Sequence, residues 1–214
     1  GAVRFIGVEQ KYGGRYLPET KGYAAQTIAH NTIVVDEKSH FDGKESVAEK
    51  FHAEKLFSSI SNPAVQVVAA KVDQAYKGVN LQRTVYLLEL PGNQKILVDI
   101  FNAASKDEHQ YDLPFHYNGH LISTSFKYSP YTGMQEPLGK KNGYQYLWKE
   151  ADAMVADTVV QLTFLNERTY YSISSLVKGQ AQVFFTRSGA NDPNFNLRHE
   201  PALIIRKKGI DQSF

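Results

Sequence analysis

Short runs of aromatic and β-branched residues constrain the fold of this chain more than any other feature. The 13 Tyr and 12 Phe residues lie among Val, Ile and Thr, and the runs do not follow a helical period. Such side chains fit the pleated surface of a sheet, so the runs indicate strands. We predict strands over residues 32–36, 64–72, 81–90, 95–101, 121–128, 158–165, 169–176, 181–187 and 202–208.

Turn signals between these runs indicate how the strands are connected. Pro91-Gly92-Asn93 lies between residues 81–90 and 95–101, which predicts one hairpin, and Asn166-Glu167 predicts another between 158–165 and 169–176. Strands at this density, without helical patterns of about 10 to 15 residues between them, favour antiparallel sheets packed as a sandwich. The predicted fold class is therefore all-β, an antiparallel β-sandwich. A mixed period over residues 43–57 predicts a short helix, and residues 1–26 are typical of a long ordered loop or an edge segment.

Composition places the chain in an ordinary globular class. With 214 residues, 42% of them hydrophobic and 21% charged, the chain is predicted to form one domain over residues 1–214. A formal charge of +2 is too small to predict binding to nucleic acid or to a membrane surface. The sequence has neither an apolar run of about 18 residues nor a leader-like start, so we expect no membrane span and no signal of its own. Because cysteine is absent, a metal would have to use His and carboxylate ligands.

One polar and aromatic cluster lies within the first thirty residues. Its members are Arg4, Arg15, Tyr16, Gln26, His30 and Asn31. An Arg and Tyr pair beside a His suits an acidic ligand, because the guanidinium matches a carboxylate and the phenol donates or accepts a proton. The alternative is structural: the tyrosines pack on the sheet, the arginines are solvated, and His30 is a hydrogen-bonded residue at the start of a buried strand.

A second polar group lies in the middle of the chain and consists of Asp99, His109, Asp112, His116 and His120. These residue types suit zinc or manganese, but their spacing matches no strong signature. If the run is extended, alternation places His116, Asn118 and His120 on one face, which also fits a polar outer face or the wall of a sugar groove. Motifs of serine hydrolases, nucleotide enzymes and His-Glu-x-x-His proteases are absent.

Two stretches resemble a known family. They are Arg15-Tyr16-Leu17-Pro18 and the segment from Gln26 to Asp36, which contains His30-Asn31-Thr32. They resemble the heparinase II/III-like C-terminal region of polysaccharide lyases, and most closely the family 17 oligoalginate lyases. Looser matches are Val98-Asp99-Ile100-Phe101, His109-Gln110-Tyr111-Asp112, Phe115-His116 and Arg198-His199-Glu200-Pro201-Ala202-Leu203.

The resemblance implies roles for three residues. Tyr16 is similar to the catalytic tyrosine of the family, which acts as an acid. His30 is similar to a ligand of the family's zinc, whose other two ligands, a His and an Asp, are expected upstream of Gly1. Arg4 is similar to an arginine that contacts the substrate carboxylate.

The resemblance also implies a partner half and a function. In such enzymes an N-terminal α/α toroid forms a cleft with the β region; the toroid is absent here, so we expect a fragment truncated at both ends and inactive in isolation. The implied function is β-elimination of uronic-acid glycans, chiefly as an exolytic oligoalginate lyase that releases unsaturated monouronate in the bacterial periplasm or outside the cell. A heparin or heparan sulfate lyase and a non-catalytic carbohydrate-binding or assembly module remain alternatives. A homodimer is left open.

Overall fold

The computed structural model describes residues 17–92 and 94–214. These residues form two compact units. The described part of the first unit is residues 17–39 with Gln110–Lys207, and the second unit is His40–His109 with Lys208–Phe214. Strands β5 and β10 each run along the chain from one unit into the other.

Strands account for most of the described residues, and the helical segments between them are short. The strands are β1 (Val34–Val35), β2 (Glu54–Ser59), β3 (Val65–Tyr76), β4 (Val79–Leu90), β5 (Gln94–His116), β6 (His120–Thr124), β7 (Ser129–Pro130), β8 (Leu147–Asn166), β9 (Thr169–Ser188) and β10 (Pro201–Ser213). The helical segments are η3 (Thr20–Ala24), η4 (Thr27–Ala29), η5 (His40–Gly43), α1 (Glu45–Ala48) and η6 (Tyr144–Tyr146). The prediction of an all-β, antiparallel fold of the β-sandwich class is confirmed, and none of these helical segments has the length and apolar character that crossing a membrane requires.

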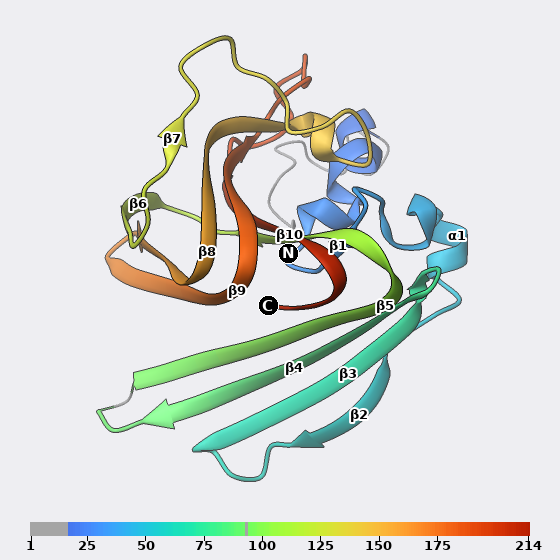
Figure 1. The fold of residues 1–214 in the computed structure, drawn as a ribbon, viewed down its shortest axis with the longest axis vertical. Helices are drawn as coiled ribbons and strands as arrows, with labels where there is room; N and C mark the ends of the chain where they lie inside the picture. Colours follow the sequence, from blue (N-terminus) through green and yellow to red (C-terminus); the bar gives the residue numbers. More distant parts are fainter. Residues whose placement is uncertain (1–16, 93) are drawn as a thin grey trace. The chain divides into compact units, whose positions relative to one another are not determined.

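In the second unit, β2, β3, β4 and the first part of β5 form an antiparallel sheet (Figure 1). The predicted hairpin between β4 and β5 is present, with Leu90 opposite Gln94. The end of β10 lies on the other side of β5, where Phe101 and Phe214 exchange backbone hydrogen bonds of 3.0 and 2.9 Å.

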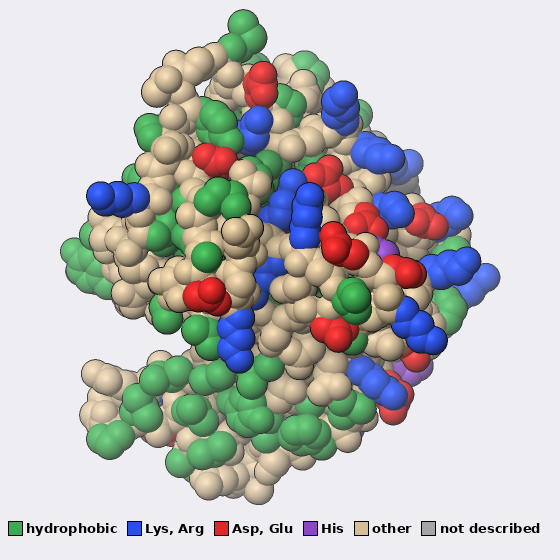
Figure 2. All heavy atoms as spheres, in the orientation of Figure 1, with side chains coloured by type: hydrophobic (Ala, Val, Ile, Leu, Met, Phe, Trp, Pro, Cys, Tyr) green, Lys and Arg blue, Asp and Glu red, His purple; other side chains and the backbone are tan. Residues whose placement is uncertain are grey.

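Apolar side chains remain exposed on the sheet of the second unit. Ile96 and Leu97 are 44% and 65% exposed, and because neighbouring residues of a strand point to opposite faces, both faces carry such side chains. Figure 2 shows hydrophobic side chains gathered over this part of the molecule. A sheet that is apolar on both faces is typical of a layer that is covered on both sides.

In the first unit, β10, β9, β8 and β6 are neighbours in that order, while β1 pairs with the end of β5 and β7 pairs with β8. The predicted hairpin between β8 and β9 is present, with Asn166 opposite Thr169. Separate strands were predicted over residues 169–176 and 181–187, and this was wrong, because β9 continues through Lys178 and Gly179. The register shifts beside Asp157, whose carboxylate accepts a hydrogen bond of 2.8 Å from the Gly179 N–H, so these residues form a bulge within a continuous ladder.

Other boundaries also differ from the sequence predictions. β5 extends to His116 rather than ending at Phe101. Residues 106–108 are charged and exposed, yet their backbone adopts the strand conformation, so the strand continues through them. β6 ends at Thr124 instead of reaching residue 128, and the predicted helix over residues 43–57 shrinks to α1 and is followed by strand β2.

The core of the first unit lies beneath the segment that contains His30. Its buried side chains are Tyr23, Ile28, Ala29, Val34, Tyr144, Leu147, Phe184, Leu197 and Ile204. Ile28 and Ala29 on η4 are fully buried, so packing fixes the residues that immediately precede His30.

Candidate functional site

His30 lies at the end of η4, on the boundary between the core and the surface of the first unit. Its backbone N–H donates to the Thr27 carbonyl over 3.0 Å, and its own carbonyl accepts from the Thr32 N–H over 2.8 Å. The backbone at His30 is extended, which ends the helical turn and leaves the imidazole partly exposed. Local hydrogen bonding therefore fixes the position of this side chain.

The hydrogen bonding of His30 also determines which ring nitrogen carries the proton. Nε2 lies 3.0 Å from the Ala24 carbonyl oxygen. Because a carbonyl only accepts, Nε2 must be the protonated nitrogen and Nδ1 holds the lone pair. Burial lowers the pKa of His30, which favours the neutral ring. A neutral imidazole whose second nitrogen is held by a backbone carbonyl is the form that binds a metal ion.

His116, at the end of β5, holds the same segment from the other side. Its Nε2 donates to the Ile28 carbonyl over 2.8 Å, and its backbone N–H donates to the Asn31 side-chain oxygen over 2.9 Å. Burial lowers the pKa of His116 to about 4, so this ring is neutral at physiological pH. These two contacts lie on either side of His30 in the sequence and fix residues 28–31 against β5.

A partly buried ion-pair network lies next to this segment and stabilises the elements around it. Arg206 on β10 donates from Nε and Nη2 to both carboxylate oxygens of Asp112, over 2.8 and 2.7 Å, and Nη2 also lies 2.9 Å from Glu37. The Tyr144 hydroxyl donates to Asp112 over 2.6 Å. Burial, followed by the Asp112 charge, raises the pKa of Tyr144 well above its ordinary value, so the phenol remains protonated. The network joins β5, β10 and the turn after β1.

The second polar group predicted from the sequence does not gather into one site. Asp99 pairs with Arg83 in the second unit, with 2.8 Å between Arg83 Nε and Asp99 Oδ1, whereas Asp112 and His116 are structural residues of the first unit. Within residues 17–92 and 94–214, no three His, Asp or Glu side chains are placed to hold a metal ion together.

The predicted alternation of His116, Asn118 and His120 on one strand is also wrong. β5 ends at His116, and Gly119 turns the chain with a φ of +102° before β6 begins at His120. A side chain at Gly119 would lie 2.1 Å from the Leu165 carbonyl oxygen, so both the turn and the close approach require glycine.

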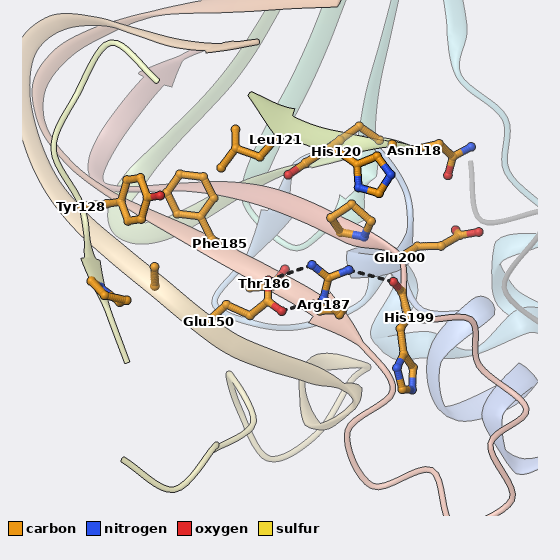
Figure 3. A pocket seen from close by; sticks show the side chains of 15 residues that line it. Asn118, His120, Leu121, Tyr128, Glu150, Phe185, Thr186, Arg187, His199 and Glu200 are labelled. Atoms are coloured by element: carbon orange, nitrogen blue, oxygen red, sulfur yellow. Dashed lines mark hydrogen bonds and ion pairs between the residues drawn. The ribbon is translucent and has the colours of Figure 1, made fainter. Parts of the chain in front are cut away.

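Asn118 and His120 instead line a pocket of about 620 Å³ in the first unit (Figure 3). Tyr128 and Phe185 form one side, with ring centroids 4.8 Å apart. Arg187 lies at the polar side, where its Nε is 2.6 Å from Glu150 and its Nη1 donates to the His199 carbonyl over 3.1 Å. Because Arg187 is already neutralised by Glu150, this pocket is poorly suited to a carboxylate ligand. The prediction of a sugar-groove wall stays a prediction.

The structure thus describes one of the three residues proposed from the resemblance. His30 lies where its Nδ1 suits a metal, whereas Arg4 and Tyr16 lie outside the described residues. Sequence reasoning missed the supporting roles of Asn31, His116 and Arg206, since each acts through a contact between distant parts of the chain. The polar clusters and the family-like stretches of the sequence included Asn31 and His116, but neither signal indicated their supporting roles.

Comparisons with known proteins agree with the resemblance. Residues 6–211 match the family model described as heparinase II/III-like, C-terminal. The chain is 40% identical over 217 residues to an exo-oligoalginate lyase of Saccharophagus degradans, and 40% identical over 210 residues to an alginate lyase of Stenotrophomonas maltophilia. These alignments cover 100% and 98% of the chain.

Two solved structures of heparinase III, the BT4657 gene product, are more distant. The first, with methylated lysines, has a TM-score of 0.38 at 11% identity and covers 86% of this chain and 24% of the other; the second has the same TM-score at 10% identity and covers 98% and 27%. The chain spans 29% and 28% of the lengths of the two alginate lyases it matches. Since the family model matches nearly all of its residues, the chain belongs to the heparinase II/III-like C-terminal family.

Proposed function

We propose that the chain is the β-sandwich part of a polysaccharide lyase that cleaves uronic-acid glycans by β-elimination, and specifically an exolytic oligoalginate lyase that releases unsaturated monouronate. The observation that carries this proposal is the 40% identity to an exo-oligoalginate lyase over the whole chain. A second relative, at the same identity, is an alginate lyase. Alginate is therefore the favoured substrate over heparin or heparan sulfate.

β-Elimination makes two chemical demands that Arg4 and Tyr16 would meet. The enzyme must remove a weakly acidic proton beside a carboxylate, which requires neutralising that carboxylate and stabilising the negative charge that develops. Arg4 suits this task because guanidinium binds carboxylate with two parallel hydrogen bonds. Tyr16, with an ordinary pKa of about 10, holds a proton at neutral pH and can donate it to the leaving glycosidic oxygen.

A zinc ion is the proposed cofactor, and His30 is its proposed ligand in this chain. The fit rests on the hydrogen bond from His30 Nε2 to the Ala24 carbonyl, which leaves the Nδ1 lone pair for a metal. When bound, zinc would organise the segments that form the cleft. From the family resemblance, we propose that a His and an Asp upstream supply the remaining two ligands.

The proposed partner half is an N-terminal α/α toroid. Two observations support it: the alginate lyase relatives are more than three times as long as the matched region, and the sheet of the second unit carries exposed apolar side chains on both faces. We propose that the chain alone is inactive because half of the substrate cleft comes from that partner. A periplasmic or extracellular location is proposed from the family resemblance alone, and cell fractionation would test it.

Tyr16→Phe in the complete lyase polypeptide tests the catalytic proposal. The variant should lose most of the unsaturated product formed from alginate oligomers, measured by ultraviolet absorbance, while Tyr170→Phe on the exposed part of β9 should retain it. Unchanged turnover in Tyr16→Phe would remove Tyr16 from the mechanism. Turnover of heparan sulfate but not alginate would show that the substrate was assigned wrongly.

The zinc proposal has a separate readout. His30→Ala should lower the zinc content of the purified complete polypeptide, measured by elemental analysis, whereas His120→Ala, exposed at the pocket, should not. Equal zinc content in both variants would contradict the assignment of His30.

A further inference from the structure

The loop between β9 and β10 contains a spacing that suits a calcium ion. Its sequence Asn191-Asp192-Pro193-Asn194-Phe195-Asn196 places oxygen-bearing side chains at alternate positions, Asp192, Asn194 and Asn196. Asp-x-Asn-x-Asn is the first half of a widespread calcium-loop signature. Leu197 replaces the glycine that usually follows, so the spacing alone is not sufficient evidence.

The Asp192 carboxylate supplies independent evidence. Its residue is only 6% exposed, and its Oδ2 accepts a hydrogen bond of 2.7 Å from the Leu197 N–H, across the loop. The carboxylate is therefore turned into the loop. Its other oxygen, Oδ1, is buried and has no hydrogen-bond partner within the described part of the chain. A buried carboxylate oxygen without a donor is costly, and a bound cation would remove that cost.

A second buried carboxylate lies beside the same loop. Glu19, in the segment before η3, is 2% exposed, and its Oε2 accepts from the Asn196 amide over 3.2 Å. Neither Glu19 nor Asp192 forms an ion pair with any Lys, Arg or His in residues 17–92 and 94–214. Burial raises the pKa of Tyr146, and the charges of Glu19 and Asp192 raise it further, so both carboxylates act on one phenol.

Both carboxylates are buried and have no cationic partner among the described residues, so a bound cation would offset the cost of their burial. The donors at Glu19 and at residues 192–196 are carboxylate and amide oxygens, and this set favours a hard cation over zinc. Calcium accepts six to eight oxygen ligands in flexible geometry. Asn194 is exposed, so water can complete the coordination on that side.

We propose that this loop binds one calcium ion through the carboxylates of Asp192 and Glu19, with side-chain oxygens of Asn194 and Asn196 and with water. The ion would join the β9–β10 loop to the segment that directly follows Tyr16. This site differs from the proposed zinc site in its residues and does not depend on the proposed lyase function.

Terbium(III) luminescence tests the proposal on the full chain after its metals have been removed by chelation. Terbium replaces calcium at oxygen sites, and we expect Tyr146, whose phenol experiences the charges of both Glu19 and Asp192, to sensitise its emission. We expect a saturable signal at one ion per chain that calcium displaces. Asp192→Asn and Glu19→Gln should each weaken terbium and calcium binding at least about tenfold, because each removes one ligand charge.

Control variants distinguish binding at this site from nonspecific binding of the ion to acidic residues. Glu167→Gln, at the exposed β8–β9 turn, and His30→Ala should leave terbium binding unchanged. Asn194→Ala alters an exposed residue and should weaken binding without affecting the near-ultraviolet circular dichroism, so it tests the site even if a buried variant fails to fold. Absence of a saturable, calcium-displaceable signal would overturn the proposal. The same would follow if Asp192→Asn, Glu19→Gln and Asn194→Ala all bound terbium as tightly as Glu167→Gln.

Discussion

Replacing His116 by Gln should remove a pH-dependent part of the stability of the first unit. Burial lowers the pKa of His116 to about 4, whereas the same ring in the unfolded chain titrates near its ordinary value of 6.5. Between these values the unfolded chain binds a proton that the folded chain excludes, so stability falls as the pH falls. The contribution of the neutral His116 ring to the free energy of unfolding is therefore complete above pH 6.5 and is lost as the pH approaches 4. Gln donates the same hydrogen bond to the Ile28 carbonyl without titrating.

The expected magnitude follows from the two pKa values. One pKa unit corresponds to about 1.4 kcal/mol, and the linkage relation gives a loss of about 2 kcal/mol between pH 7 and pH 5 for wild type relative to His116→Gln. With a urea dependence of about 1.5 kcal/mol per M, the wild-type midpoint should fall by about 1 M more than that of the variant over this range.

Urea unfolding at pH 7 and pH 5 measures this difference, because the single Trp148 lies on β8 and its fluorescence reports on the first unit. Comparison with the variant cancels the titration of the other acidic groups. His199→Gln replaces an exposed side chain and serves as the matched control. Its urea midpoint should change between pH 7 and pH 5 by as much as that of wild type. Equal pH dependence in wild type and His116→Gln would refute the reasoning that burial holds this ring neutral.

Two further substitutions test the packing around the site. Asp112→Ala leaves the Arg206 guanidinium without its main partner and should destabilise the first unit by about 4 kcal/mol in urea unfolding. Glu136→Gln breaks an exposed pair and should cost less than about 1 kcal/mol. Similar values for the two variants would contradict the proposed importance of the network. Gly119→Ala places a methyl group against a backbone carbonyl of β8 at a φ of +102° and should lower the melting temperature strongly. Gly133→Ala, with open space around it, should not lower the melting temperature. Equal melting temperatures for the two variants would contradict the requirement for glycine at this turn.

Much of the fold follows from local sequence patterns. The hairpins at residues 90–94 and 166–169 were predictable because a tight turn and alternating apolar residues act over a few neighbours. Strand ends were less predictable. The bulge at Asp157 and Gly179 required knowledge of which residues face each other, since an isolated Lys-Gly pair indicates a turn rather than a bulge.

The candidate site was also predictable from the sequence only in part. His30 was identified from the short stretch around it, which resembles a known family, and its protonated nitrogen became clear only from the contact with Ala24. His116 was predicted to lie on a polar face with His120, but it is partly buried against residues 28–31, 88 positions from its carbonyl partner Ile28. No local pattern encodes that pairing.

The sequence by itself determined the all-β class, the two hairpins and the family resemblance, because strand propensity, turn chemistry and short motifs are carried by neighbouring residues. The tertiary structure alone decided which polar residues meet. It placed Asp112 against Arg206 and Glu19 beside the loop at Asp192, separations of 94 and about 170 positions along the chain. The physical reason is that burial makes an unpaired charge costly, and only the folded chain determines which charges are buried and what lies next to them.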